Sequence, residues 1–99
     1  MPKTIAITGP TGSGKTTTAQ LLAQKIDKSV NIDADHVKHF IVNGFVYDSS
    51  ETGIDQWKLL GSNIGMLAKS YLDQNYTVII NGYINEPAWG EITKVIDID

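Results

Sequence analysis

The chain contains no cysteine, no arginine and no long apolar run, and each absence excludes a class of function. Without cysteine it can form no disulfide framework, no zinc–thiolate site and no cysteine nucleophile. Without arginine it has no bidentate guanidinium clamp and no arginine finger, because all eight of its cations are lysines. No segment approaches the about 18 apolar residues of a membrane span, and the N-terminus lacks a secretion signal.

Charge and length narrow the possibilities further. The net charge of −3 argues against binding to a nucleic-acid polymer. We therefore expect a cytoplasmic protein that binds neither membranes nor nucleic acid. At 99 residues with 41% hydrophobic residues, the chain is expected to form a single domain over 1–99.

The apolar residues alternate between two periods along the chain. Short, β-branched apolar runs predict strands at residues 4–8, 29–33 and 76–80. Helical spacing predicts helices at 15–26, 34–42, 55–74 and 88–92. Residues 45–54 show no clear period and are predicted to form a loop, and residues 94–99 are predicted to be extended.

The order β-α-β-α-α-β-α predicts an α/β fold in which helices flank both faces of a parallel sheet. Gly61 and Gly65 interrupt the longest predicted helix, where they would permit close packing. Three strands leave one edge of such a sheet uncovered. The domain is therefore expected to be incomplete at its C-terminal end.

One motif carries the chemistry. Between the first strand and the first helix the chain reads Gly9-Pro10-Thr11-Gly12-Ser13-Gly14-Lys15-Thr16, which fits the phosphate-loop pattern G-x-x-x-x-G-K-[ST]. Its glycines let backbone N–H groups approach phosphate oxygens, and the start of the helix favours negative charge. We expect Lys15 to reach the β- and γ-phosphates, Thr16 to bind Mg²⁺, and Thr17 to contact the α-phosphate.

This segment resembles the first βα unit of P-loop NTPases. The Asn-Lys-x-Asp motif of GTPases and the Leu-Ser-Gly-Gly signature of ABC-type ATPases are both absent. Two carboxylates, Asp33 and Asp35, follow the second strand at the end of the sheet where α/β proteins bind ligands. The arrangement resembles small ATP-binding P-loop kinases of the AAA-type class, including the shikimate, gluconate and chloramphenicol kinase-like families.

The resemblance implies ATP and Mg²⁺ as ligands and a small molecule or nucleotide as phosphoryl acceptor. By the same resemblance, Asp35 would orient or deprotonate the acceptor hydroxyl, and Asp33 would hold a Mg²⁺-bound water or the substrate. The two roles can be exchanged. Alternatively, both aspartates serve only to cap the next helix.

Several other side chains can be interpreted either as functional or as structural. The third strand of these kinases usually ends in Asp, but this chain has Asn81, which can neither hold a cation by charge nor take a proton. Asn81-Gly82 also reads as a tight turn. His36 and His39 have metal-ligand spacing but no third ligand, so we expect them to be solvated or packed. For Trp57, Tyr71 and Trp89, packing is preferred over stacking on a substrate ring.

The resemblance covers all 99 residues but corresponds to the N-terminal part of such a kinase, whose arginine-bearing lid lies further along the chain. The sequence is compatible with a truncated product, with a second polypeptide that supplies the rest, or with self-association. The first hypothesis is an ATP-dependent kinase. The second is an ATP- or ADP-binding module without transfer activity, and a motor ATPase ranks last.

Overall fold

A computed structural model of the chain describes residues 2–8, 14–46 and 48–98. Within these ranges it contains three strands and four helices. The strands are β1 (Thr4–Ile7), β2 (Ser29–Asp33) and β3 (Thr77–Asn81). The helices are α1 (Lys15–Lys25), α2 (Ala34–Lys38), α3 (Glu51–Leu72) and α4 (Glu86–Thr93).

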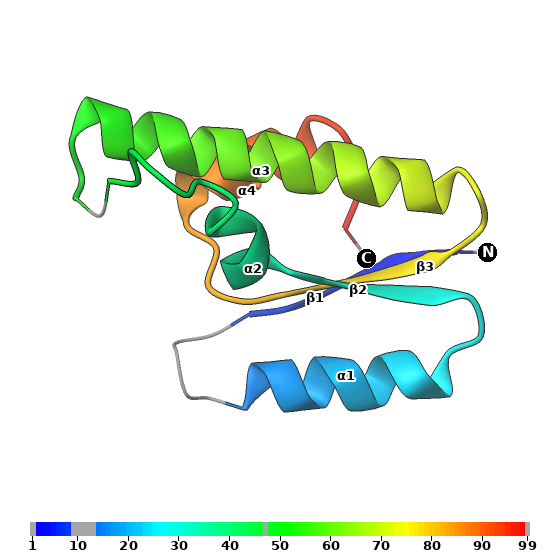
Figure 1. Ribbon diagram of the computed structural model, residues 1–99. Coiled ribbons are helices and arrows are strands. Elements are labelled where there is room, and N and C mark those ends of the chain that lie inside the picture. Colours follow the sequence, from blue (N-terminus) through cyan, green and yellow to red (C-terminus); the bar gives the residue numbers. More distant parts are fainter. Residues whose placement is uncertain (1, 9–13, 47, 99) are drawn as a thin grey trace.

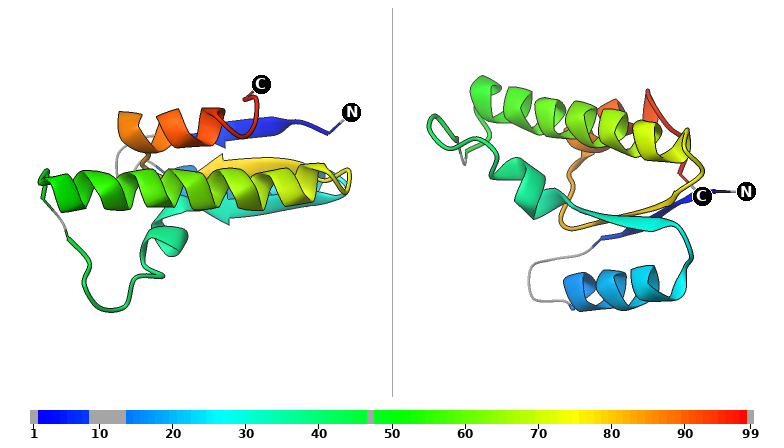
Figure 2. Two further views of the ribbon diagram at one scale, coloured as in Figure 1. Left: turned by 90° about the horizontal axis from the view of Figure 1, so that it is seen from above. Right: turned by 45° about the vertical axis from the view of Figure 1, so that its right-hand side comes forward.

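The strands form one parallel sheet in the order β1-β3-β2. Helix α1 covers one face of this sheet, while α3 and α4 lie side by side on the other (Figures 1 and 2). The predicted α/β fold, with a parallel sheet between layers of helices, is therefore confirmed. None of the helices in the described ranges combines the length and apolar character needed to cross a membrane.

The main hydrophobic core lies between the sheet and the α3–α4 pair. Val78 and Ile80 of β3 point into it, together with Ile64 of α3 and Ile92 of α4, and all four are fully buried. The opposite face of β3 presents Ile79, which is also fully buried, on the side that α1 covers with Ala19. Because both faces of β3 are covered, its nearly continuous apolar sequence is that of a central parallel strand.

Helix α2 is shorter than the sequence indicated. It ends at Lys38 rather than at residue 42. Only Ala34 and Val37 face the interior, whereas Phe40 and Val42 are 63% and 95% exposed. Phe40 and Val42 therefore bury little of their apolar surface, and the chain leaves the helix after Lys38.

Helix α3 begins at Glu51, so the loop predicted to extend to residue 54 is wrong over its last four residues. The Ser50 hydroxyl caps the helix by accepting a hydrogen bond from the N–H of Gly53 at 3.2 Å. Hydrogen bonds from the Ser50 side chain and backbone also lower the pKa of the Asp48 carboxyl. The prediction placed the start of α3 at residue 55 because it relied on the spacing of apolar residues. The Ser50 cap is the sequence signal that marks the earlier start.

The C-terminal part follows the prediction more closely. Pro87 lies in the first turn of α4, which Asn85 caps by accepting from the N–H of Ala88 at 3.2 Å. The stretch predicted to be extended at 94–99 forms no strand in its described part: residues 94 and 95 make a turn. Ile96 then packs, 7% exposed, into the main core.

Gly61 sets the distance between α3 and α4. A Cβ atom at this position would collide with the backbone carbonyl of Ala88. A Cβ at Gly65, one turn further along, would lie 3.1 Å from the Val95 side chain and 3.5 Å from the Cα of Ile92. The two glycines that lower helix propensity thus permit close packing, as predicted, with the tighter backbone contact at Gly61.

We predict that Gly61→Ala destabilises the protein by about 2 kcal/mol, because overpacking at the helix contact outweighs the gain in helix propensity. Thermal unfolding measures the effect. Gly90→Ala on α4 is the matched control, since no atom lies within 4 Å of a Cβ built there. It should be neutral or slightly stabilising, and equal melting temperatures for the two variants would contradict the role given to Gly61.

Candidate functional site

The carboxyl ends of the three strands meet at one edge of the sheet. The register aligns Ile7 of β1 with Asn81 of β3, and Asn81 with Asp33 of β2. Gly82 then turns the chain away from the sheet with φ +122°, and a Cβ there would lie 3.0 Å from the Ala34 side chain. Only glycine fits this turn without strain, because any other residue would need a positive φ and would crowd Ala34.

The phosphate-loop motif connects β1 to α1 at this same edge. Gly9, Pro10, Thr11, Gly12 and Ser13 lie outside the described residues, so their predicted phosphate contacts stay predictions. Gly14 forms the N-cap of α1 with φ +81°. The first turn of α1 carries no acidic side chain. The partial positive charge at this helix end is therefore not neutralised locally, which suits a phosphate.

The three motif residues that follow Gly14 open α1. The backbones of Lys15 and Thr16 form its first two positions. Their side chains are not among those that the structure describes. Thr17 is exposed. The predicted roles of Lys15, Thr16 and Thr17 stay predictions. Their backbones lie at the start of α1, where a phosphate group would bind.

Asp33 caps α2. Its Oδ1 accepts hydrogen bonds from the N–H groups of Asp35, at 2.9 Å, and of His36, at 3.4 Å. The capping interpretation of Asp33 is therefore confirmed. Its second carboxylate oxygen has no hydrogen bond in the described part of the chain, so capping leaves it available for a ligand.

Asp35 lies in the first turn of α2, and its residue is exposed. Its carboxylate makes no hydrogen bond or ion pair within the described residues, in contrast to that of Asp33. A solvated carboxylate without a structural partner is free to accept a hydrogen bond from an incoming hydroxyl. Of the two aspartates, Asp35 is therefore the better suited to orient or deprotonate the hydroxyl group of a phosphoryl acceptor.

Asn81 is fully buried and belongs to a chain of amides. Its Nδ2 donates to Asn31 Oδ1 at 2.6 Å and to the carbonyl of Ile32 at 3.4 Å. Asn31 in turn donates to Gln20 Oε1 on α1 at 3.3 Å. In this amide orientation Nδ2 meets two oxygens, and Asn81 Oδ1 is left buried without a partner in the described part of the chain.

This orphaned oxygen tests whether the site fits Mg²⁺. A buried polar atom without a partner costs free energy unless a ligand or water satisfies it. Mg²⁺ prefers oxygen ligands and keeps several of its waters, which hydrogen-bond to nearby carboxylate and carbonyl oxygens. Asp33 and Asn81 are neighbours across the register and offer one oxygen of each kind. The residues therefore fit a hydrated magnesium ion.

Each of the two histidine rings contacts an aromatic side chain. The ring of His36 packs edge-to-face with Phe40, and the ring of His39 stacks on Phe45 with centroids 5.4 Å apart. His39 Nδ1 lies 2.7 Å from the carbonyl oxygen of Asp35. Among the described residues no three potential metal-binding side chains of His, Asp or Glu come together. The ring contacts and the exposure of both residues agree with the expectation that the histidines are packed or solvated.

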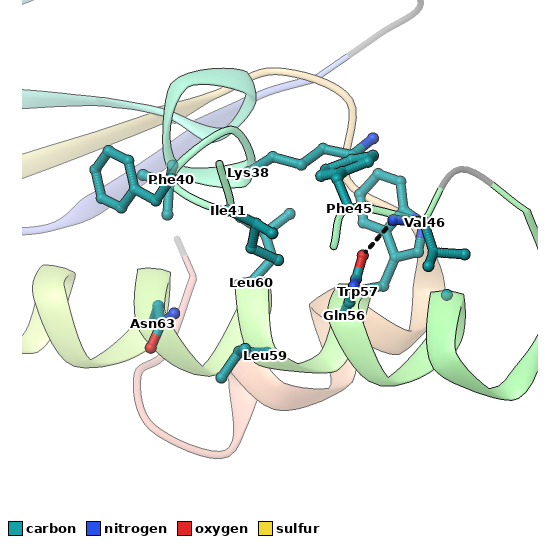
Figure 3. Close-up of a pocket in the computed structure, with 12 residues that line it drawn as sticks. Lys38, Phe40, Ile41, Phe45, Val46, Gln56, Trp57, Leu59, Leu60 and Asn63 are labelled. Atoms are coloured by element: carbon teal, nitrogen blue, oxygen red, sulfur yellow. Dashed lines mark hydrogen bonds between the residues drawn. The ribbon is translucent and has the colours of Figure 1, made fainter. Parts of the chain in front are cut away.

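A pocket of about 140 Å³ lies beside this edge, between α2, the loop after it and α3 (Figure 3). At its mouth the Lys38 ammonium lies 4.0 Å from the centre of the Trp57 ring and 5.5 Å from that of Phe45. Trp57 also packs edge-to-face on Tyr83, just after β3. Sequence reasoning missed Lys38, because no local pattern indicates that it meets a tryptophan on another helix.

A parallel sheet with a phosphate-loop motif between its first strand and first helix defines a P-loop NTPase. The family model described as Zeta toxin matches residues 1–94 of the chain. The chain therefore belongs to the Zeta toxin family, whose members are P-loop, kinase-like ATP-binding proteins. The chain has no match among curated proteins. The likeness to the shikimate, gluconate and chloramphenicol kinase-like families stays a prediction.

We predict that Asn81→Asp lowers the stability of the ligand-free protein by about 1–3 kcal/mol, because it replaces the donor to Asn31 with a buried negative charge. Mg²⁺ with nucleotide should then raise the melting temperature of this variant more than that of the unmodified protein.

Asn31→Asp is the matched control. It keeps the oxygen that accepts from Asn81 and loses only the exposed contact to Gln20. Its magnesium response should stay unchanged. If Asn81→Asp gained nothing from Mg²⁺ over nucleotide alone, the oxygen of residue 81 would have no part in metal binding.

Proposed function

We propose that the chain binds Mg²⁺-ATP at residues 9–17 and transfers the γ-phosphoryl group to a hydroxyl or phosphate group of a small molecule or nucleotide. The observation that carries this proposal is the position of the motif. In the chain it joins the carboxyl end of β1 to an α1 whose first turn has no acidic side chain, and Asp33 ends β2 and Asp35 follows it at the same edge of the sheet. Membership of a kinase-like family supports it.

In phosphoryl transfer the protein mainly positions the reactants and stabilises charge. The acceptor oxygen forms a bond to the γ-phosphorus while the bond to the β–γ bridging oxygen breaks, and ADP leaves. Asp35 takes the hydroxyl proton, and Lys15 offsets charge on the phosphates. Thr16 and the oxygens of Asp33 and Asn81 would hold magnesium and its waters. Bound Mg²⁺ neutralises charge on the phosphate oxygens.

A second candidate function is a module that binds ATP or ADP without transferring phosphate. Two observations favour it: the absence of arginine from the sequence, and the amide of Asn81 where the related kinases have a carboxylate. An arginine finger raises the rate by about 10³–10⁵ in GTPases. Transfer by this chain alone is therefore expected to be slow.

Binding is tested by thermal unfolding with Mg²⁺-ATP. At about 100 times its dissociation constant, the ligand should stabilise the protein by about 2.7 kcal/mol, which raises the melting temperature of a domain this size by about 10 °C. Lys15→Ala should abolish the shift, because it removes the cation that reaches the phosphates.

Lys25→Ala, at the far end of the same helix, is the control for the loss of a lysine. It should retain the full ATP-induced shift. If the protein unfolded cooperatively at the same melting temperature with and without Mg²⁺-ATP, nucleotide binding would be refuted, and with it both candidate functions.

Transfer is tested by following labelled γ-phosphate onto a panel of hydroxyl acceptors. We expect Asp35→Asn to lower the rate at least about 100-fold, because an amide cannot take the acceptor proton, and to leave the ATP-induced thermal shift intact.

Asp33→Asn separates the two aspartates, since asparagine caps a helix as well as aspartate does and α2 should be retained. It should weaken magnesium-dependent binding of ATP. If Asp35→Asn kept the full rate while Asp33→Asn lost it, the two roles would be exchanged.

A further inference from the structure

The dipeptide Asn–Gly occurs twice in the chain, as Asn43-Gly44 and as Asn81-Gly82. Asparagine is a chemically labile residue. Its side-chain amide is lost most readily when glycine follows, because no Cβ then shields the next backbone nitrogen, which attacks the side-chain carbonyl carbon. Both dipeptides are therefore candidates for spontaneous deamidation, and the fold decides which of them reacts.

The fold protects Asn81-Gly82. Asn81 is fully buried at the end of β3, and its Nδ2, which would leave as ammonia, donates to Asn31 and to the carbonyl of Ile32. The nitrogen of Gly82, which would attack, donates to the carbonyl of Ile7 at 3.2 Å. Both reacting groups are engaged in native hydrogen bonds, so the reaction requires this edge of the sheet to open.

Asn43-Gly44 has the opposite surroundings. Both residues are exposed, and they lie between α2 and α3, outside any helix or strand. Within the described residues neither the Asn43 side chain nor the N–H of Gly44 makes a hydrogen bond. A Cβ built on Gly44 would have no atom within 4 Å, so the surrounding structure does not crowd this position. Water and base reach both reacting groups without any opening of the fold.

The segment that follows Asn43 is held to α3 by one side chain. Gln56 donates through Nε2 to the carbonyl of Gly44 at 2.9 Å and accepts from the N–H of Val46 at 2.9 Å. Figure 3 shows the second of these bonds. Residues 39–43 connect this held segment back to α2. A change in backbone length at residue 43 therefore alters the position in which Gln56 can hold the loop.

We propose that Asn43-Gly44 is a site of spontaneous deamidation in the folded protein, and that the isoaspartate it produces weakens the hold of Gln56 on the loop. The Gly44 nitrogen loses its proton to base and forms a bond to Asn43 Cγ, the Cγ–Nδ2 bond breaks, and ammonia leaves. Water then opens the succinimide ring. Hydrolysis at Cγ gives aspartate. Hydrolysis at the backbone carbonyl carbon gives isoaspartate, in which the main chain runs through Cγ and is longer by one carbon.

The site is tested on the folded full chain, incubated at mildly alkaline pH and then cut after lysine in slightly acidic buffer. Residues 39–58 form one fragment, with Asn43 as its only asparagine, and residues 70–94 form another, which contains Asn81. Mass spectrometry follows both positions. We expect Asn43 to react at least about 100 times faster than Asn81, because Asn81 reacts only in the small population whose sheet edge is open. In urea the two rates should be similar.

Asn43→Gln is the matched control for the chemistry. It keeps a side-chain amide but would have to form a six-membered ring, which closes more slowly, so the fragment of residues 39–58 should stay unmodified. Asn43→Asp is the control for charge, since it installs the aspartate product with a normal backbone. Thermal unfolding checks that both variants are folded.

The effect on the loop is read from the Val46 amide by ¹⁵N NMR. Aged protein that contains isoaspartate is separated by ion exchange. We expect its Val46 resonance to shift and its Val46 N–H to exchange faster with solvent, because the bond to Gln56 is weakened. The Asn43→Asp variant should keep the resonance and exchange rate of the unmodified protein.

Equal rates at the two dipeptides in the folded protein, or a faster reaction at Asn81, would overturn the proposed site. So would a reaction at Asn43 that proceeds in urea and stops in the folded protein. A Val46 amide that is unchanged in the isoaspartate form, or that changes equally in Asn43→Asp, would overturn the effect on the loop. None of these measurements contains ATP, so they do not depend on the proposed function.

Discussion

The central position of β3 is the constraint on which the rest of the structure depends. Both other strands hydrogen-bond to it in parallel, and residues 78–81 are completely buried between α1 on one face and the α3–α4 pair on the other. A strand buried on both faces must satisfy its backbone within the sheet, which sets the register of its neighbours. That register brings Ile7, Asn81 and Asp33 to one level, and the candidate site forms at the edge where they end.

The amide of Asn81 shows how a polar group is tolerated at so buried a position. Its donor is satisfied twice, by Asn31 and by the carbonyl of Ile32, whereas its acceptor oxygen has no partner among the described residues. A carboxylate there would face the Asn31 oxygen at the same short distance. The neutral side chain is therefore compatible with the ligand-free fold, and its remaining oxygen is the group that would respond to magnesium and its waters.

Much of the fold could be predicted because its signals are local. The apolar runs at 29–33 and 76–80 and the helical period from Lys15 onward need no distant partner to be recognised. Predictions were wrong at element ends. Helix α2 stops early, where Phe40 and Val42 bury little of their apolar surface, and α3 starts early because Ser50 caps it. Both depend on contacts and hydrogen bonds that hydrophobic periodicity does not report.

By itself the sequence determined the α/β class, the phosphate-loop motif and the aspartates that follow the second strand, since each is a pattern of neighbouring residues. Only the tertiary structure decided that Asn31 meets Asn81 across 50 positions of the chain and that Lys38 rests on Trp57. It also distinguished Asp33, whose carboxylate caps α2, from Asp35, whose carboxylate has no partner among the described residues. Such pairings follow from sheet register and helix packing, which bring together residues that no local pattern connects.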